Sequence, residues 1–282
     1  MSLSLTGGAT RCWCADSGVV DVTLSRADQG AAWSCAPDRG PAKPGGATNS
    51  PGSVGCIAPA CGFRDLGGTR PDKEDRARSW WGGNFLGAPG ETVPHCTKSG
   101  REMHPILQIR TDELAGLDRP LEGAALVTLW LDLDSETFWG ARDGEAFTMR
   151  TYDSLDGLVP IGPGYRESDA LPTFPVIWEA AIPGQPAWED MSYRVPRRVA
   201  WAREDDWFFG SKTALACYGI RETHPVQIGG WPQWIQGAHW PKGGLFLFQI
   251  DSTQKGRMGF GDSGSIYLFR SSEGFEIRGD CY

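Results

Sequence analysis

Residues 244–250 read Gly-Leu-Phe-Leu-Phe-Gln-Ile, with apolar side chains on both faces until the end of the stretch. This pattern is expected of a central strand that is covered on both sides. Residues 125–134 and 265–270 also have strand composition. Residues 174–178 predict a fourth strand, which Pro175 places at a sheet edge or a strand start. The body of the chain is therefore predicted to be mainly sheet.

The same stretch belongs to an internal repeat. Each copy has a Gly-Gly turn, a Pro turn, an apolar strand that closes on Gln-Ile, and a further apolar strand. The first copy consists of Gly82-Gly83, Pro94, residues 105–109 with Gln108, and residues 125–134. The second consists of Gly229-Gly230, Pro241, residues 246–250 with Gln249, and residues 265–270. The shared order predicts a duplicated sheet unit whose two copies pack as pseudo-symmetric sheets.

Two residue types in this repeat are predicted to be structural. The Gly-Gly pairs permit positive φ or a close backbone approach. Gln108 and Gln249 lie in buried-looking strands, where an amide needs all its hydrogen bonds satisfied. We therefore expect both amides to bind neighbouring backbone in the core rather than a ligand.

Helical signals are short, at residues 111–117 and 187–193. The predicted fold class is α+β, mainly antiparallel β with short helices and an internally duplicated, pseudo-two-fold sheet unit. Residues 36–60 are rich in Pro, Gly, Ser and Ala, which is typical of a loop. We therefore expect a Cys/Gly/Pro-rich head and loop over residues 1–60, with one strand at 19–24. The main domain is predicted over residues 61–282, with halves at about 79–150 and 220–282 and a connecting segment between them.

Composition limits the class of protein. Of 282 residues, 40% are hydrophobic and 22% charged, which excludes wholesale disorder. The net charge is -8, and residues 79–282 carry 18 basic and 27 acidic side chains, a net charge of -9. An acidic chain has no overall field that attracts nucleic acid or anionic lipid. No apolar run approaches the roughly 20 residues of a membrane-spanning helix. Residues 1–11 lack a secretory signal pattern, so the expected location is cytoplasmic.

Five of the eight cysteines lie in the first 61 residues, namely Cys12, Cys14, Cys35, Cys56 and Cys61. Their spacing differs from the paired two-residue gaps of zinc ribbons. Free thiols are the expected state in a reducing compartment, with metal binding and disulfides as the open alternatives.

Several motifs in the body resemble the YwqG-like family, a bacterial domain of unknown function. They are residues 79–84, 100–109, 224–236, 247–252 and 259–264, together with the closing Cys281-Tyr282. The resemblance spans roughly residues 79–282, and its motifs occur in order. It implies a cytoplasmic bacterial protein with a duplicated, sheet-rich α+β fold, and it supplies no catalytic residues. It also implies a genomic context, since relatives are thought to lie near toxin genes as candidate immunity proteins.

Residues 261–264, Gly-Asp-Ser-Gly, suggest a serine hydrolase with Ser263 as nucleophile. The pair His95-Cys96 upstream, with Asp132 or Asp134 between, follows the chain order of chymotrypsin-like enzymes. However, the usual residues after the Ser are replaced by Ser265-Ile266, and only 18 residues follow Gly264. We therefore favour a turn in which Asp262 and Ser263 cap backbone amides, and catalysis by Ser263 as the least favoured alternative.

No residue pattern predicts a metal or a cofactor. The four histidines, at positions 95, 104, 224 and 239, form no ligand pair with helical spacing. The carboxylates at 132, 134, 136, 143 and 145 lack the spacing of a calcium loop. A solvated strand end is the preferred explanation of these carboxylates.

The candidate binding residues are aromatic. Trp231, Trp234 and Trp240 lie within ten residues of a turn rich in Gly, Pro and Gln, and Trp81 has the equivalent place in the first copy. Such rings stack on sugars or anchor protein interfaces. The alternative is that they fill the core between the sheets. The candidate set is completed by His224 and Gln236, which flank the same turn.

The preferred hypothesis is a non-enzymatic binding protein that contacts another protein, with a basic toxin as one partner. The second is a glycan- or small-ligand-binding module with a Trp-lined cleft between the halves, and the third is the hydrolase.

Overall fold

The computed structural model describes residues 9–14, 18–23, 58–64, 75–117, 120–133, 139–161, 171–179, 182–184, 190 and 225–282. The chain divides into two compact units. One contains residues 1–58 and 183–221, and the other contains residues 59–182 and 222–282. In the first unit, β1 (Ala9–Cys14) and β2 (Gly18–Thr23) form an antiparallel hairpin. The strand predicted at 19–24 is thus confirmed as β2, and the cysteines at 35 and 56 lie outside the described residues.

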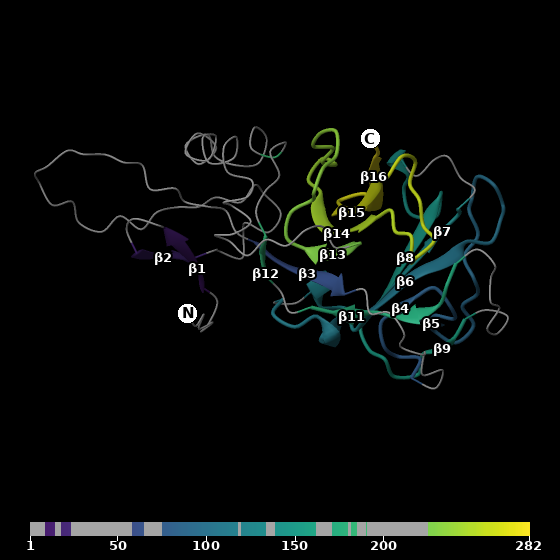
Figure 1. Ribbon diagram of the computed structural model, residues 1–282. Coiled ribbons are helices and arrows are strands. Elements are labelled where there is room, and N and C mark those ends of the chain that lie inside the picture. The colour runs from purple at the N-terminus through teal and green to yellow at the C-terminus, as the bar shows by residue number, and fades with distance from the viewer. Residues whose placement is uncertain are drawn as a thin grey trace, which may run out of the picture. The chain divides into compact units, whose positions relative to one another are not determined.

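The second unit is built on two antiparallel sheets (Figure 1). The first sheet has the order β10-β4-β6-β7-β8. Its strands are β10 (Phe174–Pro175), β4 (Trp80–Trp81), β6 (His104–Arg110), β7 (Leu126–Leu131) and β8 (Phe147–Tyr152). The strands β5 (Leu86–Gly87) and β9 (Val159–Pro160) form a separate antiparallel pair.

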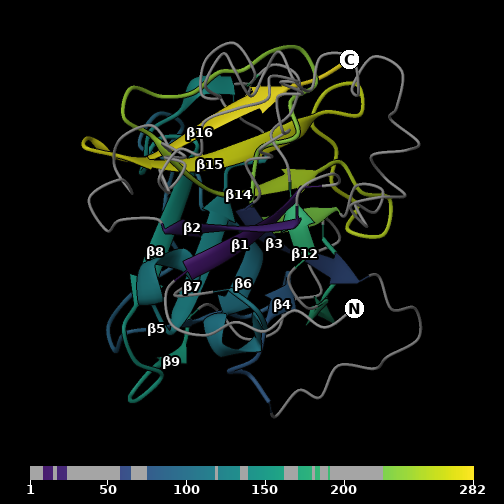
Figure 2. The ribbon, with the colours of Figure 1, turned by 90° about the vertical axis from the view of Figure 1, so that its left-hand side faces the viewer.

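The second sheet has the order β11-β3-β13-β14-β15-β16. Its strands are β11 (Ile177–Trp178), β3 (Ala58–Arg64), β13 (Val226–Gly229), β14 (Leu245–Asp251), β15 (Ser265–Ser271) and β16 (Gly274–Asp280). A further short strand, β12, covers Ile182–Gly184. Figure 2 shows β15 and β16 running across the strands β6, β7 and β8 of the first sheet.

Helix is scarce in the described residues. Two short 3-10 elements lie wholly within the described residues, η2 (Thr111–Glu113) and η3 (Pro120–Gly123). The helix predicted at 111–117 is therefore a single turn, and the one predicted at 187–193 lies almost entirely outside the described residues. The fold is mainly antiparallel β. No helix in the described part of the chain is both long and apolar enough to cross a membrane.

The core lies between the two sheets. One cluster of buried side chains includes Ile109, Val127 and Leu129 of the first sheet and Phe248 and Ile266 of the second. Burying such side chains stabilises the fold by about 1.5–3 kcal/mol each. The opposite face of the first sheet is also covered, by a second cluster formed by Trp80, Phe85, Cys96, Met103, Trp130 and Ile161. Strand β7, residues 126–131, accordingly carries apolar side chains on both faces.

The four-strand meanders β4-β6-β7-β8 and β13-β14-β15-β16 share detailed geometry. The β6–β7 register shifts between Pro105 and Leu107, and the β14–β15 register shifts between Phe246 and Phe248. Both shifts lie at the same distance before the Gln of each strand. The Gly-Gly pairs also agree, since all four glycines have φ between 61° and 91°.

The two glutamines make equivalent hydrogen bonds. Gln108 Oε1 accepts from the Leu86 amide at 2.8 Å, and Gln249 Oε1 accepts from the Gln233 amide at 2.8 Å. Each amide lies three residues beyond the second Gly of its pair. Gln108 Nε2 also donates to the carbonyls of Arg76 and Arg78. Both side chains therefore fix the loop that follows the Gly-Gly turn.

Residues 174–178 differ from the single strand that the sequence predicts. Phe174 and Pro175 pair with β4 in the first sheet, whereas Ile177 and Trp178 pair with β3 in the second. Val176, which is fully buried, separates the two pairings. The segment therefore passes from one sheet to the other, and Pro175 lies in an edge strand, where its missing N–H is tolerated.

Candidate functional site

The loop between β13 and β14 covers the outer face of the second sheet with aromatic rings. Trp234 stacks on Phe269 with ring centroids 5.9 Å apart and lies 4.6 Å from Tyr267. Trp240 meets Trp231 at 6.3 Å and Phe269 at 5.2 Å, both edge to face. Such contacts add about 0.5–1.5 kcal/mol each beyond burial. The structure thus brings together the three predicted Trp residues of the second half.

Burial separates these rings into two groups. Trp231 and Trp234 have exposed fractions of 4% and 7%, so they act as the hydrophobic cover of the sheet. Their indole Nε1 atoms are buried and have no hydrogen-bond partner among the described residues. Trp240 is only partly buried and is the ring of this loop that a ligand can reach.

Trp81 does not join this group. Its ring is fully buried in the core between the sheets, where it stacks on Phe174 at 6.0 Å. Its Nε1 donates to the Gly256 carbonyl at 3.2 Å, which connects the first sheet to the β14–β15 hairpin. Solvent does not reach the ring, so the binding role predicted for Trp81 is replaced by a core role.

The remaining candidates lie apart. His224 is outside the described residues. Gln236 is exposed, and its Nε2 donates to the Cys281 carbonyl at 2.6 Å. This bond ties the Trp loop to the end of β16. Asp262 is exposed in the turn before β15, and its backbone carbonyl accepts from the Tyr282 amide at 3.0 Å.

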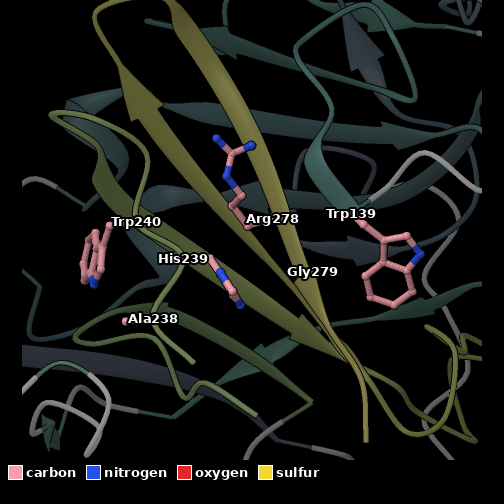
Figure 3. Close-up of a pocket in the computed structure, with 6 residues that line it drawn as sticks. All are labelled: Trp139, Ala238, His239, Trp240, Arg278 and Gly279. Atoms are coloured by element: carbon pink, nitrogen blue, oxygen red, sulfur yellow. The ribbon is translucent and has the colours of Figure 1, made fainter. Parts of the chain in front are cut away.

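A hollow of about 430 Å³ lies at the end of β16. It is lined by Trp139, Ala238, His239, Trp240, Arg278 and Gly279. Figure 3 shows the loop residues Ala238, His239 and Trp240 on one side of β16 and Trp139 on the other. Trp139 comes from the segment between β7 and β8, so both halves of the unit contribute to the hollow. Its exposed fraction is 41%.

Backbone pairing holds Trp139 at this place. The Ile277 amide donates to the Ala141 carbonyl at 3.0 Å, and the Asp143 amide donates to the Phe275 carbonyl at 3.2 Å. Residues 141–143 therefore run along the free edge of β16. The indole packs on the backbone of Gly279, where a Cβ atom would lie 2.4 Å from Trp139. A side chain at position 279 would displace the ring.

The charged groups around the hollow are paired internally. Arg278 Nη2 donates to Glu276 Oε2 at 2.8 Å, and Nη1 donates to the Ile277 carbonyl at 3.3 Å. The Asp280 carboxylate lies 3.3 Å from His239 Nε2, and its Oδ2 accepts from the Ile235 amide. Glu276 and Asp280 are buried, whereas His239 and Arg278 are partly exposed. The polar groups that a ligand in the hollow can reach are therefore mainly hydrogen-bond donors.

The Gly-Asp-Ser-Gly motif forms a turn. Ser263 is exposed with φ of 51°, and Gly261 has φ of 57°. Gly264 donates its amide to the Phe260 carbonyl at 2.8 Å, and its own carbonyl accepts from Ser252 Oγ at 2.8 Å. No histidine in the described part of the chain forms a hydrogen bond with Ser263. His95 instead lies 4.0 Å from Glu102, and His239 is next to Asp280.

Asp132 is a buried carboxylate whose main partners, Ser99 and Arg101, are exposed. Its carboxylate accepts from Ser99 Oγ at 2.7 Å and from Arg101 Nη2 at 3.1 Å. Burial raises the pKa of Asp132, but hydrogen bonds from Ser99, Cys96 and Arg101 and the Arg101 charge outweigh it and hold the pKa below its usual range. Asp132 is thus a structural carboxylate that fixes the loop before β6, rather than a solvated strand end. Asp134 lies outside the described residues.

Asp251 is an unusual carboxyl group. It is the last residue of β14 and pairs across the sheet with Ser265. Its Oδ1 accepts from Ser265 Oγ at 2.7 Å and from Gln249 Nε2 at 3.0 Å. Burial raises the pKa of Asp251 to about 6, although both hydrogen bonds act to lower it.

The raised pKa of Asp251 predicts a pH-dependent stability. The folded protein holds this proton more tightly than the unfolded chain, whose pKa is about 3.9. The stabilisation is fully present below about pH 4 and is lost as pH rises through about 6. We expect Asp251→Asn to exceed the wild type in unfolding free energy by on the order of 2–3 kcal/mol at pH 7.5 and to match it near pH 4.

Urea denaturation of both proteins from pH 4 to pH 8 measures this difference. Asp262→Asn, at an exposed site, is the matched control and should follow the wild type throughout. A constant difference between Asp251→Asn and the wild type over this range would contradict the expectation.

The described residues contain no group of three or more His, Cys, Asp or Glu side chains that is placed to hold a metal ion. A scan of the chain against protein-family models returns no match, and a search of curated proteins returns none either. The resemblance to the YwqG-like family therefore stays a prediction.

Sequence reasoning missed Trp139 and Arg278 and set His239 aside. Trp139 stands outside the Trp-rich turn, and Arg278 lies in a strand of mixed composition, Gly-Phe-Glu-Ile-Arg-Gly-Asp. One signal was present. The repeat places an Arg on the last strand of each copy, at 150 and at 278, but this match is visible only once the strand register is known.

Proposed function

We propose that this chain is a non-enzymatic binding protein that contacts another protein through the surface around the hollow. The observation that carries the proposal is the exposed aromatic and basic surface there. Trp139 has an exposed fraction of 41%, and Arg278 and His239 lie between the rings of Trp139 and Trp240. Trp, Tyr and Arg are the residues that dominate binding energy at protein interfaces.

The chemistry of the described side chains supports binding over catalysis. The serine of the Gly-Asp-Ser-Gly turn lacks a histidine partner among the described residues, and Asp132 is bound to Arg101 rather than to a histidine. Asp280 binds backbone amides of the Trp loop and stands next to His239. These groups hold loops in place.

The shared geometry of the two meanders supports a further part of the proposal, that the unit arose by duplication of one sheet module. Equal register shifts, equal glycine conformations and equal Gln-to-amide bonds are what a duplicated module would retain. A duplicated module would fit the predicted α+β fold class and the resemblance to the YwqG-like family. It would also fit the immunity-type function that this resemblance implies. The net charge of -9 over residues 79–282 would favour a basic partner during encounter.

A capture experiment tests the binding function. Tagged wild type, Trp139→Ala and Val159→Ala are used as bait in extracts of the source organism, and bound proteins are quantified by mass spectrometry. Val159 is the matched control because it is also exposed and apolar, at 39%, but lies in β9.

We expect one protein to be enriched by the wild type and by Val159→Ala. Trp139→Ala should lose it at least tenfold, as removal of a central aromatic anchor costs about 2 kcal/mol or more. Equal enrichment by all three baits would count against this surface, and no enriched protein would count against the function.

A glycan or other small ligand is the second candidate. A volume of about 430 Å³ lies within the range of small-molecule sites, about 300–1,000 Å³. Trp139 and Trp240 would provide stacking faces. Titration with a glycan panel should then quench Trp fluorescence in the wild type and not in Trp139→Ala. Absence of quenching across the panel would remove this candidate.

A further inference from the structure

The two sheets carry cross-strand rows that begin with a Gln and end with an Arg. In the first sheet, Gln108 pairs with Thr128, which pairs with Arg150. In the second, Gln249 pairs with Tyr267, which pairs with Arg278. Because both glutamines bind the amide three residues beyond their Gly-Gly pair, the rows start from equivalent points. Arg150 and Arg278 therefore occupy equivalent positions.

The loop of the first sheet covers its arginine with acceptor oxygens. Arg150 Nη2 donates to the Thr92 carbonyl at 3.0 Å, and Nη1 lies 3.9 Å from Glu91 Oε2. The same Glu91 oxygen accepts from Tyr152 OH and from the Ala88 amide, both at 2.7 Å. The Thr92 carbonyl thus accepts one hydrogen bond from this arginine, and the Glu91 carboxylate faces its Nη1 as an ion pair without a hydrogen bond.

The loop of the second sheet is too short to do the same. From the second Gly of the pair to the register shift, the chain takes 22 positions in the first sheet, Gly83 to Pro105, and 16 in the second, Gly230 to Phe246. In the described structure, the printed hydrogen bonds of the Arg278 side chain go to Glu276 and to the Ile277 carbonyl of its own strand, and Arg278 lines the hollow. The hollow lies where the first sheet has its own Glu-bearing segment.

Arg278 keeps donors for an incoming group. A guanidinium has five N–H donors, and the bonds to Glu276 and to the Ile277 carbonyl use two of them. Glu276 also accepts from Ser271 Oγ, and Asp280 binds the Trp loop, so both carboxylates are buried and engaged. His239 and the Trp139 ring border the same space.

We infer that the hollow binds a carboxylate-bearing peptide segment, which occupies over Arg278 the place that Glu91 and Thr92 occupy over Arg150. This inference rests on the proposed binding function and names the chemistry of the partner. The carboxylate forms charge-assisted hydrogen bonds with Arg278, and the adjoining peptide packs against Trp139 and Trp240.

The probe is a peptide that copies residues 88–94, Ala-Pro-Gly-Glu-Thr-Val-Pro, with acetylated and amidated ends. Binding is followed by Trp fluorescence and by the NMR signal of the Arg278 Nε–H group. Three matched peptides serve as comparisons. One replaces Glu by Gln, a second has the Gln sequence with a free terminal carboxylate, and a third has the residues in scrambled order.

We expect the Glu peptide to bind and to shift the Arg278 signal, with the Gln peptide at least tenfold weaker. Arg278→Lys should weaken the Glu peptide, whereas Lys98→Ala, which also alters one exposed positive side chain, should not. Binding of the Gln peptide that carries a free terminal carboxylate would support the inference and identify a chain terminus as the source.

Equal affinity for the capped Glu and Gln peptides would overturn the inference, as would no binding at about 10 mM peptide, tenfold above a Kd of about 1 mM. Binding of a neutral saccharide in place of every peptide would overturn it as well. The capture experiment with Trp139→Ala distinguishes failure of the carboxylate assignment from failure of the proposed binding function. A partner that depends on Trp139, without any preference for carboxylate peptides, preserves the binding function and removes only the carboxylate assignment.

Discussion

Gly264→Ala should reduce the free energy of unfolding by about 3 kcal/mol, because the added Cβ would meet two backbone oxygens. It would lie 2.2 Å from the Phe260 carbonyl and 2.3 Å from the Asp280 carbonyl. Neither oxygen is the end of a flexible side chain, so the turn and the end of β16 would both have to move. Urea denaturation measures the loss.

Ser263→Ala is the matched control in the same turn. Ser263 is exposed, and alanine tolerates its φ of 51° no worse than serine does, so stability should change by about 0.5 kcal/mol or less. A hydrolase that used Ser263 would show the reverse sensitivity, with activity lost in Ser263→Ala. If Gly264→Ala stays within about 1 kcal/mol of the wild type, the structural explanation of the motif is wrong.

Gln108→Leu should cost about 3–5 kcal/mol, since one buried and two partly buried hydrogen bonds disappear together. The Leu86 amide loses its acceptor, and the carbonyls of Arg76 and Arg78 lose their donor. A leucine fills the space but leaves these backbone groups unsatisfied, and each such group costs about 1–3 kcal/mol. Thermal and urea unfolding of the variant give the value.

Gln249→Leu tests the equivalent position in the second sheet. It removes the acceptor of the Gln233 amide and a donor to Asp251, so a loss of about 2–4 kcal/mol is expected. Because the bond from Gln249 lowers the pKa of Asp251, the variant should also raise that pKa further. Gln236→Leu is the control, since this exposed amide makes one described bond. Equal effects of all three substitutions would contradict the buried role of the two strand glutamines.

The strands predicted from the sequence were those with continuous apolar runs. Residues 125–134, 244–250 and 265–270 correspond to β7, β14 and β15, because each is buried on both faces. β8 and β16 were missed because their sequences mix Thr, Arg and Glu with apolar residues. A sheet edge tolerates such composition, and periodicity alone does not separate it from a loop.

The change of sheet at Val176 could not be predicted from residues 174–178, since local composition does not determine which neighbour a strand pairs with. The helix predicted at 111–117 is only the short turn η2 in the structure. Local composition could not separate the two, because its caps and polar residues also suit a single turn. Tertiary packing outweighs weak local preference in both cases.

The candidate site was predictable only in part. The Trp-rich turn was identified from the sequence, but not which of its rings are exposed. Trp231 and Trp234 are buried and cover the sheet, whereas Trp240 is partly exposed. The hollow depends on a difference in loop length between two sheets of equal register. That comparison needs the register shifts at Pro105 and Phe246, which the sequence does not reveal.

Photocrosslinking at position 139 tests most directly whether the surface around the hollow binds a partner. A photoreactive phenylalanine analogue replaces Trp139 in one protein and Val159 in another, and both are irradiated in cells of the source organism. One defined adduct with a second protein is expected at position 139 and none at position 159. No adduct at position 139, or the same adducts at both positions, would contradict binding at this surface.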